Sequence, residues 1–175
     1  VRRVIDEVGT ALPQESVNKE QWCLAILRSG DGPARRALWI DYDARERHSH
    51  ADGINIGLFA KGLDLIPDFG YPPVGYGGWE APKARWYQCT PAHATVTVDG
   101  KNHIRDSPPG KTTLWADGER VHAIAVSAPE VAAAERFDRT VVLIDLDDEG
   151  CCVLDCFRVV GGADHADFFH SHFGQ

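Results

Sequence analysis

Residues 140–160 read TVVLIDLDDEGCCVLDCFRVV, and this stretch decides the fold class. Two runs rich in β-branched and aromatic residues, Thr140–Leu146 and Cys151–Val160, flank the polar turn formers Asp147–Gly150. β-Branched and aromatic side chains suit a pleated, half-buried strand, whereas Asp and Gly adopt the backbone conformations of tight turns. The stretch therefore predicts a β-hairpin and an antiparallel arrangement of strands.

The same pattern recurs along most of the chain. Further strand-like runs, each bounded by turn formers, are Trp22–Arg28, Ala37–Tyr42, Ile54–Ala60, Ala94–Val98 and Val121–Ser127. Only Pro129–Phe137, with three consecutive alanines, has helical propensity, and this segment could equally be a strand edge. We therefore predict an all-β chain that forms one domain over residues 1–175, because 175 residues with 43% hydrophobic content can bury one core.

Charge and cysteine content exclude several classes of protein. The net charge of −8 argues against a general nucleic-acid or anionic-membrane surface, and no run has the apolar length of a membrane span or a secretory signal. Five cysteines, an odd number, do not form a disulfide framework. Cys152 and Cys156 alternate with Leu154, so they share one strand face, where we expect buried small hydrophobic residues rather than metal ligands.

A long segment, residues 69–90, breaks the rhythm of strands and turns. It is rich in glycine, proline, tryptophan and tyrosine and also carries Lys83 and Arg85. Long loops of this kind tend to be functional. Aromatic rings that stack on pyranose faces, beside cations that pair with carboxylate or sulfate, indicate a sugar-binding cleft. The alternative for this segment is a flexible surface insertion without a function of its own.

Four potential metal ligands lie at the edges of strand-like runs. His48 and His50 alternate, Asp68 follows the next strand-like run, and His93 opens the one after the long segment. Neutral imidazoles and a carboxylate are ligands that zinc prefers, and a fourth group beside them is then free for chemistry. The set predicts a metal site, and a hydrogen-bonded core or surface cluster is the alternative.

These residues resemble a known family. The motif H-x-H-A-D at His48–Asp52, D-x-G at Asp68–Gly70 and R-x7-H-x-T-V-x-V-D-G at Arg85–Gly100 are similar to the β-sandwich domain of the heparinase II/III-like polysaccharide lyases, which include oligo-alginate lyases. The tail DCFRVVG at Asp155–Gly161, followed by His165, agrees with that family's pattern. The resemblance runs from about Trp22 to His172, nearly the whole chain.

The resemblance implies an antiparallel β-sandwich of the supersandwich type and a lyase that cleaves uronic-acid polysaccharides by β-elimination. In the family an N-terminal α/α-toroid of helices packs against this sandwich, and the cleft lies between them. We expect the present chain to be a fragment that lacks this helical domain and is inactive alone. The implied partner is an acidic polysaccharide or oligosaccharide, and the implied location is periplasmic or secreted in a bacterium.

The resemblance also assigns roles to individual residues. It implies a structural zinc ion held by His50, Asp68 and His93, with His48 in the cleft as a catalytic residue. Among the loop residues, Tyr76 is our candidate for proton transfer to or from the sugar, because a hydroxyl near cations can accept or donate a proton. The candidates for binding the acidic sugar are Arg85, Lys83 and Tyr71.

Two departures from the family pattern stand out. The usual asparagine after the histidine of H-N-T-V is Ala94, which predicts the loss of a side-chain hydrogen bond beside the metal and a looser geometry. The tyrosine, histidine and asparagine that the family draws from its helical domain are not in this chain.

The remaining histidines and arginines carry weaker signals. His165, His170 and His172 predict exposed strand positions near the chain terminus, and His103 and His122 have no obvious partners. The pairs Arg35–Arg36 and Arg45–Arg47 form either a basic rim toward an anionic glycan or a solvated face.

Two other classes of protein compete with a lyase domain. A cupin-like metal enzyme also presents H-x-H on strands, but the residues ADGINIGLF after His50 lack the expected glutamate. A non-catalytic carbohydrate-binding module would keep the sandwich and the aromatic loop without the chemistry.

Overall fold

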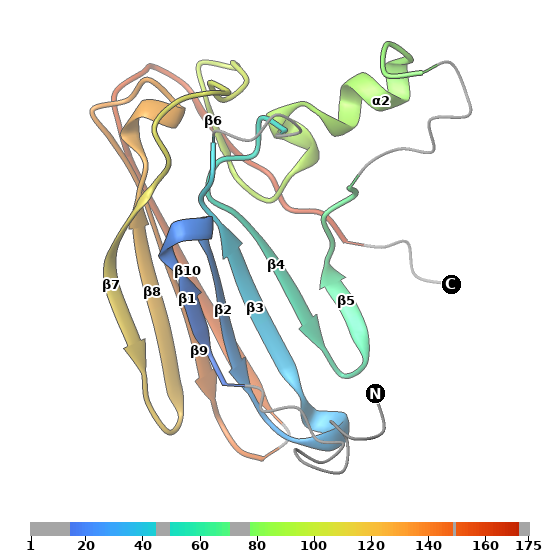
Figure 1. Cartoon of the computed structure of the whole chain (residues 1–175), viewed down its shortest axis with the longest axis vertical. Coiled ribbons are helices and arrows are strands. Elements are labelled where there is room, and N and C mark those ends of the chain that lie inside the picture. Colours follow the sequence, from blue (N-terminus) through green and yellow to red (C-terminus); the bar gives the residue numbers. More distant parts are fainter. Residues whose placement is uncertain (1–14, 45–49, 71–77, 149, 172–175) are drawn as a thin grey trace.

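The computed structural model describes residues 15–44, 50–70, 78–148 and 150–171, which form two large antiparallel sheets and one small one (Figure 1). The first sheet has the order β1-β2-β3-β4-β5 and is formed by Val17–Lys19, Leu24–Ser29, Arg36–Asp41, Asn55–Ala60 and Leu63–Ile66. The second has the order β10-β9-β8-β7 and is formed, in chain order from β7, by Lys111–Asp117, Val121–Ser127, Arg136–Asp145 and Cys151–Val160.

The small sheet and the helical turns lie mostly at the ends of the strands. The small sheet pairs β6 (Val96–Val98) with β11 (His165–Asp167). The helix α2 (Pro82–Tyr87) stands at the upper end in Figure 1. Single 3-10 turns are η1 (Glu20–Trp22), η2 (Gly32–Ala34), η3 (Thr90–Ala92) and η4 (Pro129–Val131). Within the described ranges, no helix is long and apolar enough to cross a membrane.

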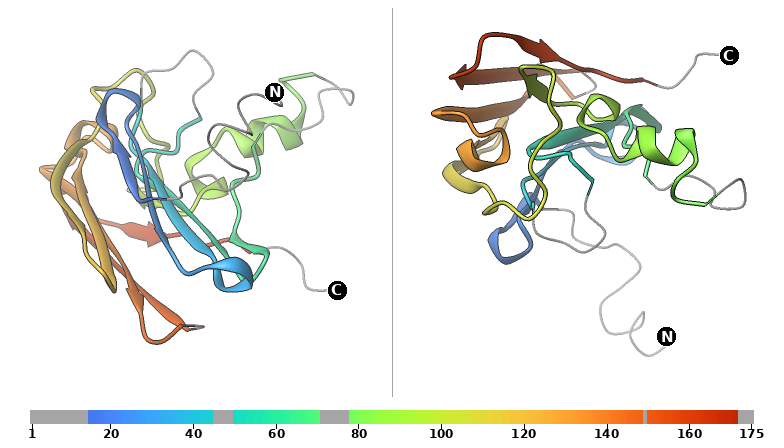
Figure 2. Two further views of the ribbon diagram at one scale, coloured as in Figure 1. Left: turned by 60° about the horizontal axis from the view of Figure 1, so that its bottom comes forward. Right: turned by 90° about the horizontal axis from the view of Figure 1, so that it is seen from above.

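The two large sheets pack face to face and enclose the core, as Figure 2 shows from two further sides. Side chains alternate between core and outside along β3 and β9, as expected of strands with one buried face. Ile40 of β3 lies opposite Ile56 of β4, and both belong to one buried cluster with Val141 and Leu143 of β9. The predicted antiparallel β-sandwich is therefore confirmed.

The hairpin predicted from residues 140–160 is also confirmed, since β9 and β10 pair in register from Asp145↔Cys151 to Arg136↔Val160. The segment Pro129–Phe137, for which the sequence allowed a helix or a strand edge, forms the single turn η4 and then the start of β9 at Arg136. Its alanines do not extend a helix because Ala133 adopts a left-handed backbone conformation, φ 49°, which turns the chain toward β9.

The cysteines and two of the histidines also differ from expectation. Cys152 and Cys156 do share one face of β10, but it is the outer face, and both are exposed. Their strand lies at the edge of the sheet, and no layer among the described residues covers that face. His103 is buried, bonds through Nε2 to the carbonyl of Val96 (2.8 Å) and meets the ring of Phe137 edge-on.

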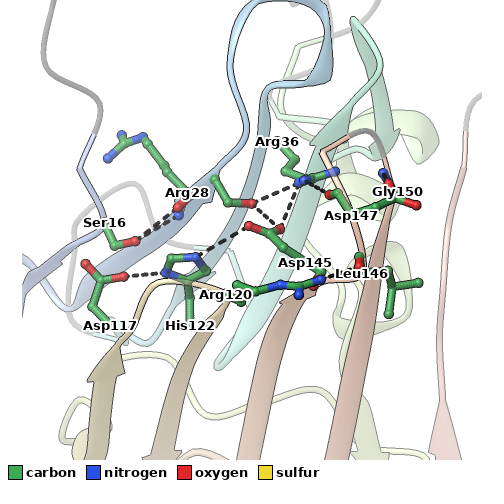
Figure 3. Close-up of polar contacts among 11 residues, drawn as sticks. Ser16, Arg28, Arg36, Asp117, Arg120, His122, Asp145, Leu146, Asp147 and Gly150 are labelled. Carbon is green, nitrogen blue, oxygen red and sulfur yellow. Dashed lines mark hydrogen bonds and ion pairs between the residues drawn. The ribbon is translucent and has the colours of Figure 1, made fainter.

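A group of polar side chains ties the two sheets together at the end opposite α2 (Figure 3). Asp145, at the end of β9, accepts a hydrogen bond from the hydroxyl of Ser29 of β2 (2.7 Å) and forms an ion pair with Nε of Arg36 of β3 (3.0 Å), which donates to the same hydroxyl (2.9 Å). His122 of β8 bonds through Nδ1 to Asp117 of β7 and lies 4.0 Å from Asp145 through Nε2. His122 thus has a partner, contrary to expectation.

The same contacts correct one hypothesis about the arginines. Arg36 is buried and paired with Asp145, so it is not part of a basic rim. Arg35 is exposed at the same end, and Arg45–Arg47 lie outside the described residues.

A fully buried arginine crosses the core near the other end of the sandwich. The guanidinium of Arg139 (β9) donates two hydrogen bonds to the carboxylate of Asp155 (β10), at 2.9 and 2.6 Å. Its Nη1 donates to the backbone carbonyls of Ile54 and Ala94, at 2.8 and 2.5 Å. A buried charge is tolerated only when it is paired and hydrogen-bonded, and these four hydrogen bonds meet both conditions.

We expect Arg139→Met to lower the free energy of unfolding by about 3–5 kcal/mol, because it leaves the Asp155 carboxylate and two carbonyls without their donor. Chemical denaturation measures the change. The matched control is Arg136→Met on the same strand, where the exposed ion pair with Asp138 contributes about 1 kcal/mol or less. Equal losses in both variants would contradict this account of the core.

Candidate metal centre

Three side chains from distant parts of the sequence converge beside the start of β4. A nitrogen of His50, a carboxylate oxygen of Asp68 and a nitrogen of His93 all lie within 4.8 Å of one another. His50 precedes β4, Asp68 follows β5 by two residues, and His93 follows η3 directly. The structure therefore brings together all three residues expected from the resemblance. Whether they hold a metal stays a prediction.

His93 is held in one orientation by both of its ring nitrogens. Its side chain is 1% exposed, Nε2 lies 3.0 Å from the carbonyl oxygen of Tyr87, and Nδ1 lies 3.1 Å from Oδ2 of Asp68. Because a carbonyl only accepts, Nε2 carries the hydrogen of this bond. In the neutral ring the lone pair on Nδ1 then faces a carboxylate oxygen, and two such acceptors need a proton or a metal cation between them.

Asp68 is fixed in the same way. Its Oδ1 accepts a hydrogen bond from the backbone N–H of Gly70 (2.6 Å), and its Oδ2 accepts one from the side-chain amide of Asn55 (2.9 Å). The carboxylate therefore cannot turn freely, and Oδ2 is the oxygen presented to His93.

The electrostatics of the three groups differ. Burial opposes the charged form of His93, but the hydrogen bond to Asp68 and the carboxylates of Asp52 and Asp68 outweigh it and raise the pKa of His93. Burial likewise opposes the charged form of Asp68, but His93 and the N–H of Gly70 lower the pKa of Asp68. Burial, together with the neighbouring His93, lowers the pKa of His50.

These residues fit a zinc ion in donor type, and the separation of His93 from Asp68 fits the spacing of zinc ligands. Two imidazoles and a carboxylate are typical zinc ligands, and bonds of about 2.0–2.1 Å in a tetrahedron place ligand atoms about 3.3 Å apart. The separation of Nδ1 of His93 and Oδ2 of Asp68, 3.1 Å, is close to this value. The Nε2–H of His93 donates to a backbone carbonyl, which is the kind of partner that orients a metal-binding histidine.

The expected substrate-binding residues lie in part on α2. Arg85 pairs with Glu80 at 2.6 Å, and both side chains are exposed, while Nζ of Lys83 lies 5.7 Å from the centre of the Tyr87 ring. His48, Tyr71 and Tyr76 lie outside the described residues. The long segment expected to be irregular thus contains a short helix, which begins at a proline, a residue suited to the first turn of a helix.

Aromatic rings gather beside α2 and the histidine site. Phe69 stacks on Tyr87 at 5.9 Å between ring centres and approaches His170 at 5.4 Å, and His170 meets Trp86 edge-on. The side chain of Trp86 remains 45% exposed. His170, expected at an exposed strand position, is half-buried, follows β11 and bonds to the carbonyl of Pro91. His165 does lie exposed on β11, and His172 is outside the described residues.

Sequence reasoning missed three residues of this site. Asn55 bonds to Asp68, Arg105 is an exposed cation whose charge acts on His50, and Asp41 ends β3 directly opposite Asn55. A signal existed for Asn55, because it is a lone amide in the apolar run INIGLFA. The loop around Arg105 and the acidic end of β3 carry no local pattern that points to this site.

The match of the sequence to a family model agrees with this geometry. The model for the C-terminal domain of heparinase II/III-like proteins matches residues 26–173. The chain belongs to the heparinase II/III-like family. A comparison with curated protein sequences finds no match.

Solved structures of this family share the fold. A mutant of the heparan sulfate lyase HepC from Pedobacter heparinus superposes with a TM-score of 0.71 at 23% identity, over 92% of this chain and 25% of that one. A heparinase III gene product superposes with a TM-score of 0.76 at 18% identity, over 99% of this chain and 27% of that one. The present heparinase II/III-like chain thus spans about a quarter of the length of these proteins.

Acidic side chains surround the histidines. Burial, and then the nearby carboxylates of Asp52, Asp43 and Asp68, raise the pKa of Asp41 from 3.8 to about 7. The unfolded chain releases this proton near 3.8, whereas the folded protein keeps it until about 7. Between these values the unfolded state binds fewer protons, so the stability of the metal-free protein falls as pH rises.

We therefore expect Asp41→Asn to stabilise the metal-free protein, with a gain that grows between about pH 4 and 7 and then levels off on the order of 2 kcal/mol. Thermal and chemical denaturation in the presence of a chelator, as a function of pH, measures the gain. Asp31→Asn in an exposed turn at the other end of the sandwich is the control and should change little. A gain in stability that does not depend on pH would contradict the raised pKa of Asp41.

Proposed function

We propose that this chain is the β-sandwich domain of a polysaccharide lyase that cleaves uronic-acid-containing polymers by β-elimination and carries a structural zinc ion. The observation that carries the proposal is the convergence of His50, Asp68 and His93 on a domain of the heparinase II/III-like family. Two proteins with similar structures are a heparan sulfate lyase and a heparinase III, which supports an acidic polysaccharide as substrate.

The zinc ion, when bound, would neutralise Asp68 and hold the segment after β5 and the one after η3 together. The residues of this chain orient the ligand atoms. Asp68 and His93 keep their ligand atoms aligned through bonds to Gly70, Asn55 and the Tyr87 carbonyl. We propose that the site anchors His48, two residues before His50, at the cleft.

β-Elimination removes the proton at C5 of the uronate and develops negative charge on its carboxyl group, which nearby donors or cations must stabilise. We propose His48 and Tyr76 as the catalytic residues and Arg85, Lys83 and Tyr71 as substrate-binding residues. The geometry supports adding Arg105, because it is exposed beside the histidines and its described contacts are long ones to neutral oxygens of Gln88, 3.4 Å each. Arg85, in contrast, already has Glu80 as its partner.

The whole protein would contain an N-terminal helical domain that packs against this sandwich and completes the cleft. We propose a periplasmic or secreted location, where heparin-like polymers, hyaluronan or alginate arrive. The cupin-like alternative does not fit, because the chain belongs to another family and its strands form separate sheets. A carbohydrate-binding module without catalysis is the second candidate, supported by the exposed Trp79 and Trp86 near Lys83 on and before α2.

The zinc site is tested by metal analysis of the purified domain. We expect about one zinc per chain, lost in His50→Ala and His93→Ala together with the stability that zinc confers. His165→Ala, which removes an exposed histidine of β11, is the control and should retain the metal. A parent protein without metal, or variants that bind as well as the parent, would remove the zinc assignment.

The lyase activity is tested on the complete gene product with its helical domain. We expect ultraviolet absorbance of an unsaturated uronate to appear with an acidic polysaccharide, and His48→Ala to lower kcat by about 10²–10⁴-fold, the usual effect of losing an acid or base. His165→Ala should leave kcat unchanged. Binding of the polymer without any unsaturated product would favour the carbohydrate-binding module.

A further inference from the structure

Asn55 connects two of the three ligand-type residues of the candidate metal centre. Its Nδ2 donates to Oδ2 of Asp68 at 2.9 Å, and its Oδ1 accepts from the backbone N–H of Ala94, the residue after His93, at 2.9 Å. The residue is 2% exposed and is the first residue of β4. One side chain therefore fixes the distance between a carboxylate and the backbone that carries a histidine.

The orientation of this amide is determined by its neighbours. The N–H of Ala94 only donates, so the atom facing it is the amide oxygen, and the carboxylate of Asp68 accepts, so the atom facing it is the amide nitrogen. Both contacts require the same orientation. An aspartate, leucine or alanine at position 55 cannot make both bonds.

The bond to Asp68 selects one oxygen of the carboxylate. Oδ1 is occupied by the N–H of Gly70, while Oδ2 receives Asn55 and faces Nδ1 of His93. Without the amide, the carboxylate would be held only through Oδ1 and could turn Oδ2 away from His93. The amide thus presents a single oxygen in a fixed direction, as a monodentate metal ligand requires.

Asn55 also holds the segment that follows His93. Ala94 stands where the resemblance led us to expect an asparagine, and it has no polar side chain of its own. The amide that binds this segment comes instead from β4, and the Ala94 carbonyl is held by Arg139. The segment after His93 is therefore held at both its N–H and its C=O.

We propose that Asn55 is a positioning residue of the candidate metal centre, which aligns Oδ2 of Asp68 with His93 and so sets the affinity of the site for zinc. The inference rests on the proposed zinc site. A purely structural role would lower stability without changing the metal site, whereas a positioning role changes affinity and coordination geometry.

The test compares Asn55→Ala with Asn18→Ala in the same domain. Asn18 also makes two side-chain hydrogen bonds, to Thr112 (3.0 Å) and from the hydroxyl of Tyr42 (2.7 Å), but it lies on β1, away from the histidines in sequence and in the sheet. Zinc affinity is measured by competition with a chromophoric chelator. The visible spectrum of the cobalt-loaded protein reports the coordination geometry.

We expect Asn55→Ala to weaken zinc binding about 10–100-fold and to alter the cobalt spectrum, the usual effect of removing a partner that orients a ligand. Asn18→Ala should match the parent in both measurements even where it melts at a lower temperature. The side chain of Asn55→Ser is too short to reach both Asp68 and Ala94, so this variant should behave like Asn55→Ala. It provides a second measurement in case the alanine variant does not fold.

The possible failures are distinguishable. An Asn55→Ala protein with parental affinity and spectrum would overturn the positioning role and leave the zinc site intact. A parent that binds no zinc would overturn the site itself. If both Asn55 variants fail to fold with and without zinc, Asn55 serves the fold, and the inference is wrong.

Discussion

The buried guanidinium of Arg139 is the interaction on which the arrangement of this domain depends. It comes from β9, in the sheet that carries none of the three ligand-type residues, and its carboxylate partner Asp155 lies on the neighbouring strand. Its remaining donors hold the carbonyls of Ile54 and Ala94, each next to a residue of the candidate metal centre. Because an unpaired charge in the core is so unfavourable, losing any of these contacts would be costly, and they tie the two segments to β9.

Beyond the ends of the strands near Arg139, hydrogen bonds outside the sheets hold the backbone in place. The backbone N–H of Ala51 binds Gln88, the hydroxyl of Thr90 binds the Ala51 carbonyl, and the hydroxyl of Thr95 binds the Gly53 carbonyl. Residues 51–55 and 88–95 thus run side by side without forming a sheet. Ile54 adopts a left-handed backbone conformation, φ 50°, which is unusual for a β-branched residue and is sustained here by its surroundings. His93 lies on one of these segments and His50 directly precedes the other, so two of the three ligand-type residues are carried by irregular backbone that is nevertheless fixed, the combination that a preorganised site needs.

The parts of this molecule that local pattern could predict are the central strands and the long edge strand β10. Runs such as TVVLIDL and ALWIDY alternate against a buried core, and they became β9 and β3. The strands β1, β5 and β7 escaped prediction because they lie at sheet edges, where short or exposed segments such as VNK and LDLI need no apolar alternation. The ligand-type residues could be expected from their residue types and from a family resemblance. Asn55 is visible as a lone amide in an apolar run, but its bond to Ala94 spans 39 residues of sequence and that of Arg139 spans 45, so no local pattern indicates these partners.

The charge of the site bears directly on its proposed substrate. Asp41, Asp52 and Asp68 crowd the histidines in a chain of net charge −8, which by itself would repel an acidic polysaccharide. Burial raises the pKa of Asp41 and of Asp52, so the fold already holds two of these carboxyl groups toward their neutral forms. We infer that a divalent cation held by Asp68 and the histidines would offset this negative charge further and favour the approach of an acidic polymer to the exposed Arg105 and Lys83. An acidic centre and an acidic substrate are then compatible, because the carboxylates hold the cation and the cation reduces their repulsion of the polymer.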